Sequence, residues 1–182
     1  MHKEQDSVED DVKIFDAIID NQVGNLDTYQ FIVAYYDNFH IYPDKKYKLL
    51  RYLENDFLPS SFMYYHLGKA LVYGEGVQKN VQDGINEWVE ASQSRDDFGT
   101  MAKNGLRNLW LTEGDRYNNV LGKLLNEYDD AMKVGNHYWI KEDGKVGLAD
   151  SLANIVLPTQ YEDVKGILDH LYVVATQRVS SW

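Results

Sequence analysis

Residues 67–77 read LGKALVYGEGV, and this segment predicts the first helix and the turn of a helical hairpin. Apolar side chains recur every four residues from Met63, which indicates a helix over residues 61–73. Gly74 and Gly76 then end that helix, because a glycine that follows a helix readily takes a positive φ angle.

A second helix is predicted over residues 81–93, where small and large side chains share one face. Gly84, Trp88 and Ala91 follow one another at steps of four and three residues. Together with Gly68 in the preceding helix, this small–large–small order is what a tight antiparallel hairpin requires. The two glycines of the turn do not favour a phosphate-binding loop, because the third glycine of GxGxxG is missing and the segment before them is helical.

The hairpin pattern recurs at intervals of 36 to 39 residues. Trp88 aligns with Tyr52 at the shorter interval, and Leu67 aligns with Phe31 before it and with Leu106 after it. Such an interval is typical of helical repeats that stack into a solenoid, and the copies without glycines fit terminal, capping repeats. Helices are expected near residues 8–21, 26–38, 44–57, 61–73, 81–93, 98–112 and 115–132. The expected core contains Phe31, Leu49, Tyr52, Leu67, Leu71, Val77, Ile85, Trp88, Leu106 and Trp110.

Residues 61–93 resemble a SEL-like repeat, the glycine-marked relative of the tetratricopeptide repeat. The motif that carries the resemblance consists of Leu67, Gly68, Gly74, Gly76, Val77, Trp88 and Ala91. The chain departs from the pattern at Leu71, where an aromatic residue is usual, and at Asn80, where Asp is usual. The resemblance implies a short α-solenoid that contacts other proteins and has no catalytic activity of its own.

From Gly135 the helical period fades and a small antiparallel β-element is expected. Residues 138–141 are strand-like, and Asp143-Gly144 predicts the turn of a β-hairpin. Residues 154–157 predict a further short strand that Pro158 stops. The whole chain is therefore expected to be α+β and mainly α.

Residues 137–176 resemble one WG repeat, with Val146 at the position of the name-giving tryptophan. The alternative is an unrelated small β-element that packs on the end of the solenoid. The predicted division is a helical repeat domain over residues 1–133 and a β-rich element over residues 134–182. If the β-element is the active end of a structural or stress-linked module, its conspicuous residues are Trp139, Asp143, Gly144, Lys145 and Tyr161.

The charge is strongly acidic and lies mostly on the predicted helices. The chain has 18 Lys and Arg against 29 Asp and Glu, a formal net charge of −11, and residues 1–130 hold −10 of it. Direct binding to nucleic acid is not expected, because phosphate contacts need basic residues. A basic protein partner is favoured, since opposite charges speed encounter. Solubility alone is the other explanation of the acidity.

Tyrosine is abundant, with 14 residues, and several tyrosines fall in the predicted helices. Because Tyr29 and Tyr65 are 36 positions apart, they are expected at equivalent places in successive repeats. A row of tyrosines edged by carboxylates would be a protein-binding surface, while packing between helices is the alternative. The candidate partner-binding residues are Tyr29, Tyr36, Tyr65, Lys69 and Glu75.

The sequence contains no recognisable motif for catalysis or for cofactor binding. The chain has no cysteine and five scattered histidines, so no metal site and no cofactor are expected. It contains no GxSxG, HExxH or P-loop motif, and the expectation is a protein that is not an enzyme. An enzyme whose site is assembled from distant residues remains the alternative. Without a long apolar run or a leader, the protein is expected in the cytoplasm and not across a membrane.

Two non-enzymatic functions follow from these observations. The first is an acidic inhibitor, similar to the immunity partner of a bacterial toxin, which covers a basic active-site cleft by steric and electrostatic capping. The second is an adaptor that holds several partners in one assembly, the commoner use of SEL-like repeats. The short array favours the inhibitor, and the sequence leaves the oligomeric state open.

Overall fold

The computed structural model describes the backbone of residues 2–168 and 171–175 and the side-chain surroundings of residues 7–164. Residues 169–170 and 176–182 of the predicted β-rich element lie outside the described residues. The elements are α1 (His2–Asp20), α2 (Leu26–Phe39), α3 (Pro43–Asp56), α4 (Ser61–Tyr73), α5 (Val81–Ala91), α6 (Asp97–Glu113), a 3₁₀ turn (Gly114–Arg116), α7 (Val120–Glu127), β1 (Asp130–Val134), β2 (His137–Glu142), β3 (Lys145–Ala149), β4 (Ile155–Tyr161), β5 (Asp163–Leu168) and β6 (Leu171–Ala175). The predicted α+β, mainly α class is confirmed.

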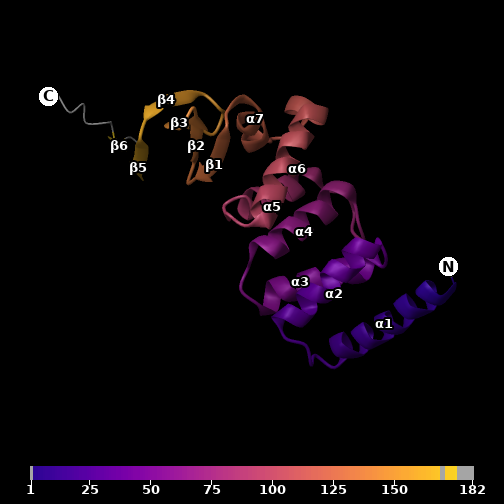
Figure 1. Cartoon of the computed structure of the whole chain (residues 1–182). Helices are drawn as coiled ribbons and strands as arrows, with labels where there is room; N and C mark the ends of the chain where they lie inside the picture. Colours follow the sequence, from indigo (N-terminus) through magenta and orange to yellow (C-terminus); the bar gives the residue numbers. More distant parts are fainter. Residues whose placement is uncertain (1, 169–170, 176–182) are drawn as a thin grey trace.

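The helices follow one another along the molecule, and α1 and the sheet lie at opposite ends (Figure 1). One buried cluster joins α1, α2, α3 and α4. A second cluster joins α5, α6 and α7 to the sheet, and it includes Ala131, Ile140 and Ala149 from one sheet face. The sheet is therefore held to the helices by a shared core. No helix in the described part of the chain has the length and apolar character needed to cross a membrane.

The predicted hairpin is formed by α4 and α5, and its close packing depends on glycine. A Cβ atom on Gly68 would lie 2.4 Å from the Trp88 ring, and one on Gly84 would lie 2.8 Å from the carbonyl oxygen of Gly68. Gly105 of α6 faces the same indole, where a Cβ atom would lie 2.9 Å away. Trp88 is thus enclosed by two helices, and its Nε1 donates a hydrogen bond to the carbonyl oxygen of Tyr65 at 3.1 Å.

The turn after α4 has the glycine conformations that the sequence predicts. Gly74 and Gly76 have φ angles of +74° and +70°, and a Cβ atom on Gly76 would lie 2.1 Å from the carbonyl oxygen of Pro43. His40 and Tyr42, 34 positions earlier, also have positive φ angles, of 53° and 47°. The turn after α2 therefore repeats the turn after α4 without its glycines, although positive φ is uncommon for other residues.

The repeat interval is not uniform, and this makes one predicted core residue wrong. The turns align at 34 positions, whereas α3 and α5 begin 38 positions apart. At the interval of 34, Leu67 corresponds to Val33, which is fully buried, and not to Phe31, which is 59% exposed. Of the other expected core residues, some are buried and some half-buried. The buried ones are Leu49, Leu67, Ile85, Trp88 and Leu106. The half-buried ones are Tyr52, Leu71, Val77 and Trp110.

The last predicted helix, over residues 115–132, is wrong at both ends. Gly114 has a φ angle of +55° and opens a short 3₁₀ turn, and α7 begins only after the buried cap Asn119. The Asn119 side chain accepts a hydrogen bond from the Gly122 N–H and donates one to the carbonyl oxygen of Leu106. From Asp130 the chain is already strand β1, which pairs with β2.

The β-element is a four-stranded antiparallel sheet in the order β1-β2-β3-β4, followed by the β5-β6 hairpin. The predicted turn between β2 and β3 is confirmed, because Asp143 and Gly144 both have positive φ angles, as a two-residue hairpin turn needs. The predicted stop at Pro158 is wrong, since β4 continues to Tyr161. β4 is an edge strand of this sheet, where a residue without an N–H group is tolerated.

Candidate functional site

Two of the predicted partner-binding residues, Tyr29 and Tyr36, lie in the core. Each is only 1% exposed, so the expectation that they line a surface row is wrong. The Tyr29 ring packs edge-on against Tyr52 with centroids 5.5 Å apart, and its hydroxyl accepts a hydrogen bond from the N–H of Gly24. Tyr36 packs against Phe15 of α1 in the same way. Both rings hold neighbouring helices together.

Lys69 and Glu75 belong to a partly buried ion-pair network between α2, α3 and α4. Lys46, which is 3% exposed, donates to Asp37 and to Glu75 at 2.7 Å each. Lys69 donates to both oxygens of Asp37, at 2.9 and 3.0 Å. Burial raises the pKa of Asp37, but the hydrogen bonds from Lys46 and Lys69 outweigh it and lower the pKa to about 2. In this structure the two predicted residues serve to join the helices.

His66 lies beside this network and is buried, and its Nδ1 has no hydrogen-bond partner among the residues that the structure describes. Its ring is 4.5 Å from the Phe62 ring and 5.9 Å from the Phe98 ring, and Nδ1 is 4.0 Å from an oxygen of Asp37. Burial lowers the pKa of His66 to about 4, which outweighs the opposite effect of Asp37. The imidazole is therefore neutral near pH 7.

An outward-facing row of rings runs along α2, and no motif in the sequence predicts it. We call Phe31, Tyr35 and Phe39 the α2 aromatic stripe, since they follow one another every four residues. Phe31 is 59% and Phe39 53% exposed. Successive ring centroids are 6.2 and 4.6 Å apart. The Tyr35 hydroxyl donates to Asp11 at 2.8 Å, and Phe15 packs against two of the rings. The stripe is thus ordered but open to solvent.

The same outward positions recur on α4. At the interval of 34, the three residues of the α2 aromatic stripe correspond to Tyr65, Lys69 and Tyr73. Tyr73 is 62% exposed, and Tyr65 is half-buried against Phe98 of α6, with ring centroids 6.0 Å apart. Tyr65 is therefore the predicted site tyrosine that keeps part of its surface in solvent. The first helices of successive hairpins thus present related faces.

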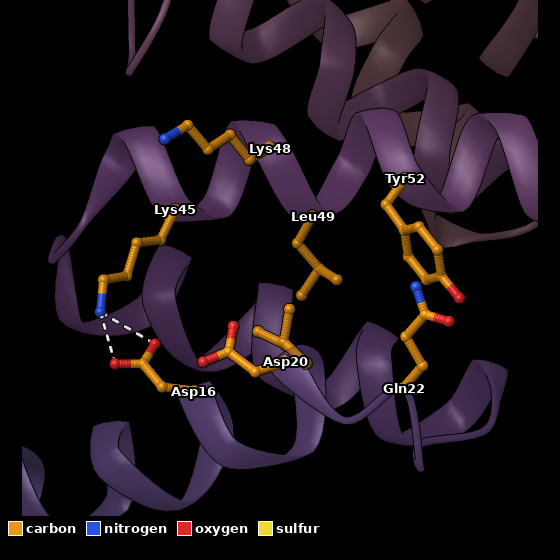
Figure 2. Close-up of a pocket in the computed structure, with 8 residues that line it drawn as sticks. Asp16, Asp20, Gln22, Lys45, Lys48, Leu49 and Tyr52 are labelled. Atoms are coloured by element: carbon orange, nitrogen blue, oxygen red, sulfur yellow. Dashed lines mark hydrogen bonds and ion pairs between the residues drawn. The ribbon is translucent and has the colours of Figure 1, made fainter.

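A cavity of about 450 Å³ lies between α1 and α3 (Figure 2). Its residues come from the last turns of α1, from the turn that follows α1 and from one side of α3, and they are Asp16, Ile19, Asp20, Gln22, Lys45, Lys48, Leu49 and Tyr52. Lys45 donates to both oxygens of Asp16, at 2.8 and 2.7 Å, and so closes one end of the cavity. No sequence motif marks this cavity, because its residues converge only when the two helices pack.

Carboxylates also approach one another between α3 and α5. Burial, and after it the charge of Glu54, raises the pKa of Glu87 to about 7, while Arg51 acts in the opposite direction. Arg51 forms an ion pair with Glu54. Within the described residues no group of three or more His, Asp or Glu side chains is placed to hold a metal ion.

Comparisons of the chain with protein-family models, with curated proteins and with solved structures found no match. The SEL-like and WG-like resemblances therefore stay predictions.

Proposed function

We propose that this chain is a non-catalytic, cytoplasmic protein-binding repeat protein that holds a basic partner against the outward face of α2 and α4. The observation that carries the proposal is the α2 aromatic stripe. Exposed rings lose contact with water when a partner covers them, and ordered aromatic side chains are the residues most enriched in binding hot spots. Because Phe15 and Asp11 already hold the stripe in place, little conformational entropy is lost on binding.

Charge supports a basic partner. Residues 1–130 hold −10 of the formal net charge of −11. Lys46 and Lys69, on α3 and α4, are already paired with Asp37 of α2. The net negative charge of the helical region attracts a basic surface at long range, and the exposed rings bury apolar area at short range. These properties suit an immunity-type inhibitor that covers the basic cleft of a toxin.

An adaptor is the second candidate, and the recurrence of the outward face on α4 favours it. Tyr73 offers an exposed ring at the position that corresponds to Phe39. A face that continues over successive hairpins can hold an extended segment or more than one partner.

The test is a pull-down with the intact chain from native lysate at low and at physiological salt, read by mass spectrometry. The double variant Phe31→Ala/Phe39→Ala is compared with Leu152→Ala, which removes an exposed side chain from the β3–β4 connection. The proposal expects one basic partner that stays bound at physiological salt. The double variant should lower its affinity at least tenfold, or about 1.4 kcal/mol, and the control should not.

Full retention of the partner by the double variant would contradict the proposed surface. Several weak partners, all lost as salt rises, would favour the adaptor over the inhibitor.

A further inference from the structure

The cavity between α1 and α3 contains one carboxylate that has no cation of its own. Lys45 is committed to Asp16 through two hydrogen bonds. Asp20 forms no ion pair or hydrogen bond with another side chain in the part of the chain that the structure describes. In Figure 2 the Asp20 carboxylate extends along α1 toward Asp16, while the ammonium group of Lys48 points away from it.

The helix that supplies Asp20 adds to the negative potential. Asp20 is the last residue of α1, and no basic residue lies in that last turn. The carboxyl end of a helix carries a partial negative charge, which favours a nearby cation. The cavity therefore has a negative end that the described side chains leave partly uncompensated.

Part of the remaining wall of the cavity is apolar. Ile19 of α1 and Leu49 and Tyr52 of α3 line it, and the Tyr52 ring and the Gln22 amide stand together at the end away from Lys45 (Figure 2). An aliphatic stem can pack on such a wall, and an aromatic ring also attracts a cation over its face. A volume of about 450 Å³ is within the range of small-ligand pockets.

We propose that this cavity binds an aliphatic cation, and that the cation is the side chain of an arginine or lysine presented by another polypeptide. Its stem packs on Ile19 and Tyr52, which are half-buried, and its charged group reaches Asp20. A polypeptide is the favoured source because the apolar wall suits a stem that carries one charge, whereas a free polyamine carries charges along its whole length. The site lies between α1 and α3 and does not require the α2 aromatic stripe.

The test is a titration of the intact, isotope-labelled chain with blocked amino acids, followed by NMR. N-acetyl-L-arginine amide and N-acetyl-L-lysine amide carry the proposed group, N-acetyl-L-norleucine amide is the neutral match, and spermidine represents a free polyamine. We expect the two cationic amides to shift the resonances of Leu49 and Tyr52, with at least tenfold weaker binding to Asp20→Asn. Asp115→Asn, an equal change of charge at an exposed residue far along the chain, should bind as the unaltered protein does.

Three results would overturn the inference. They are equal shifts with the norleucine amide, unchanged binding to Asp20→Asn, and binding of spermidine but not of the amides. Since Asp20 is exposed, the substitution leaves the core intact, and an unchanged spectrum away from α1 and α3 verifies the fold. The titration uses no protein partner, so its outcome is independent of the pull-down that tests the proposed function.

Discussion

At the scale of single residues, the contact between Gly68 and Trp88 determines how closely α4 and α5 approach. An added Cβ atom on Gly68 would lie 2.4 Å from the indole and 2.9 Å from the carbonyl oxygen of Gly84. The backbone of α5 cannot withdraw without opening the core, because Trp88 is also enclosed by Gly105 on its other side. The motif glycine of the sequence is thus a packing requirement.

Gly68→Ala is expected to destabilise the protein by about 1–3 kcal/mol through overpacking. In an exposed helix the same change stabilises by about 1 kcal/mol, so the sign of the effect separates packing from helix propensity. Denaturant unfolding measures it, and the double variant Gly68→Ala/Trp88→Phe should recover part of the loss. A Gly68→Ala variant that is as stable as the original chain would contradict this packing.

The α2 aromatic stripe shows at the same scale where sequence reasoning fails. Phe31 is expected in the core because the interval of 36 aligns it with Leu67, and Tyr36 is expected on the surface as a candidate binding residue. The structure instead places Phe31 on the surface and Tyr36 in the core. The error comes from the connection between the helices of a hairpin, which is longer after α4 than after α2. A single interval of 36 averages the true values of 34 and 38 and shifts the helix face.

At the scale of the elements, buried charge joins helices that also share an apolar core. Lys46 of α3 reaches Asp37 of α2 and Glu75 after α4, and all four groups of the network are at least partly screened from water. Removing one partner of a buried pair leaves the other without compensation, which costs more than the pair itself contributes.

Lys46→Met is therefore expected to lower the free energy of unfolding by about 3 kcal/mol. Lys45→Met is the matched control, because Lys45 is the neighbouring residue on α3 and pairs with Asp16 at the surface. Exposed pairs contribute about 1 kcal/mol or less, so the control should change little. Equal losses of unfolding free energy for the two variants in urea would show that burial of the network adds nothing to stability.

The elements that the sequence predicted well have signals at both ends. The helix over residues 61–73 begins after Ser60, which accepts a hydrogen bond from the N–H of Met63, and ends at Gly74. The helix expected over residues 115–132 had no such signal at its end, and tertiary pairing of β1 with β2 determined the structure there. The cavity between α1 and α3 was not predictable from the sequence because it depends on how those two helices pack.

At the scale of the whole molecule, the buried His66 and the half-buried Glu87 have opposite effects on how stability depends on pH. The pKa of His66 falls from 6.5 to about 4 on folding, so its contribution to stability is lost as the pH falls from 6.5 toward 4. The pKa of Glu87 rises from 4.5 to about 7 on folding, so stability is lost as the pH rises from 4.5 toward 7. The two slopes partly cancel between pH 4.5 and 6.5.

Removing either group should reveal the pH dependence of stability that the other group contributes. Glu87→Gln should give a midpoint of thermal unfolding that rises with pH between 4.5 and 6.5, and His66→Leu should give one that falls. Thermal unfolding followed by circular dichroism at half-unit steps of pH measures both profiles. Parallel profiles for the two variants and the original chain would contradict the assigned burial of these groups.

Side-chain footprinting can show whether the outward face of α2 binds a basic partner. Hydroxyl radicals label exposed rings, and the intact chain would be labelled alone and with the partner captured at physiological salt. We predict that Phe31, Tyr35 and Phe39 lose most of their labelling in the complex while Leu152 of the β3–β4 connection keeps its own. Unchanged labelling of the α2 aromatic stripe, with protection elsewhere on the molecule, would contradict binding at this face.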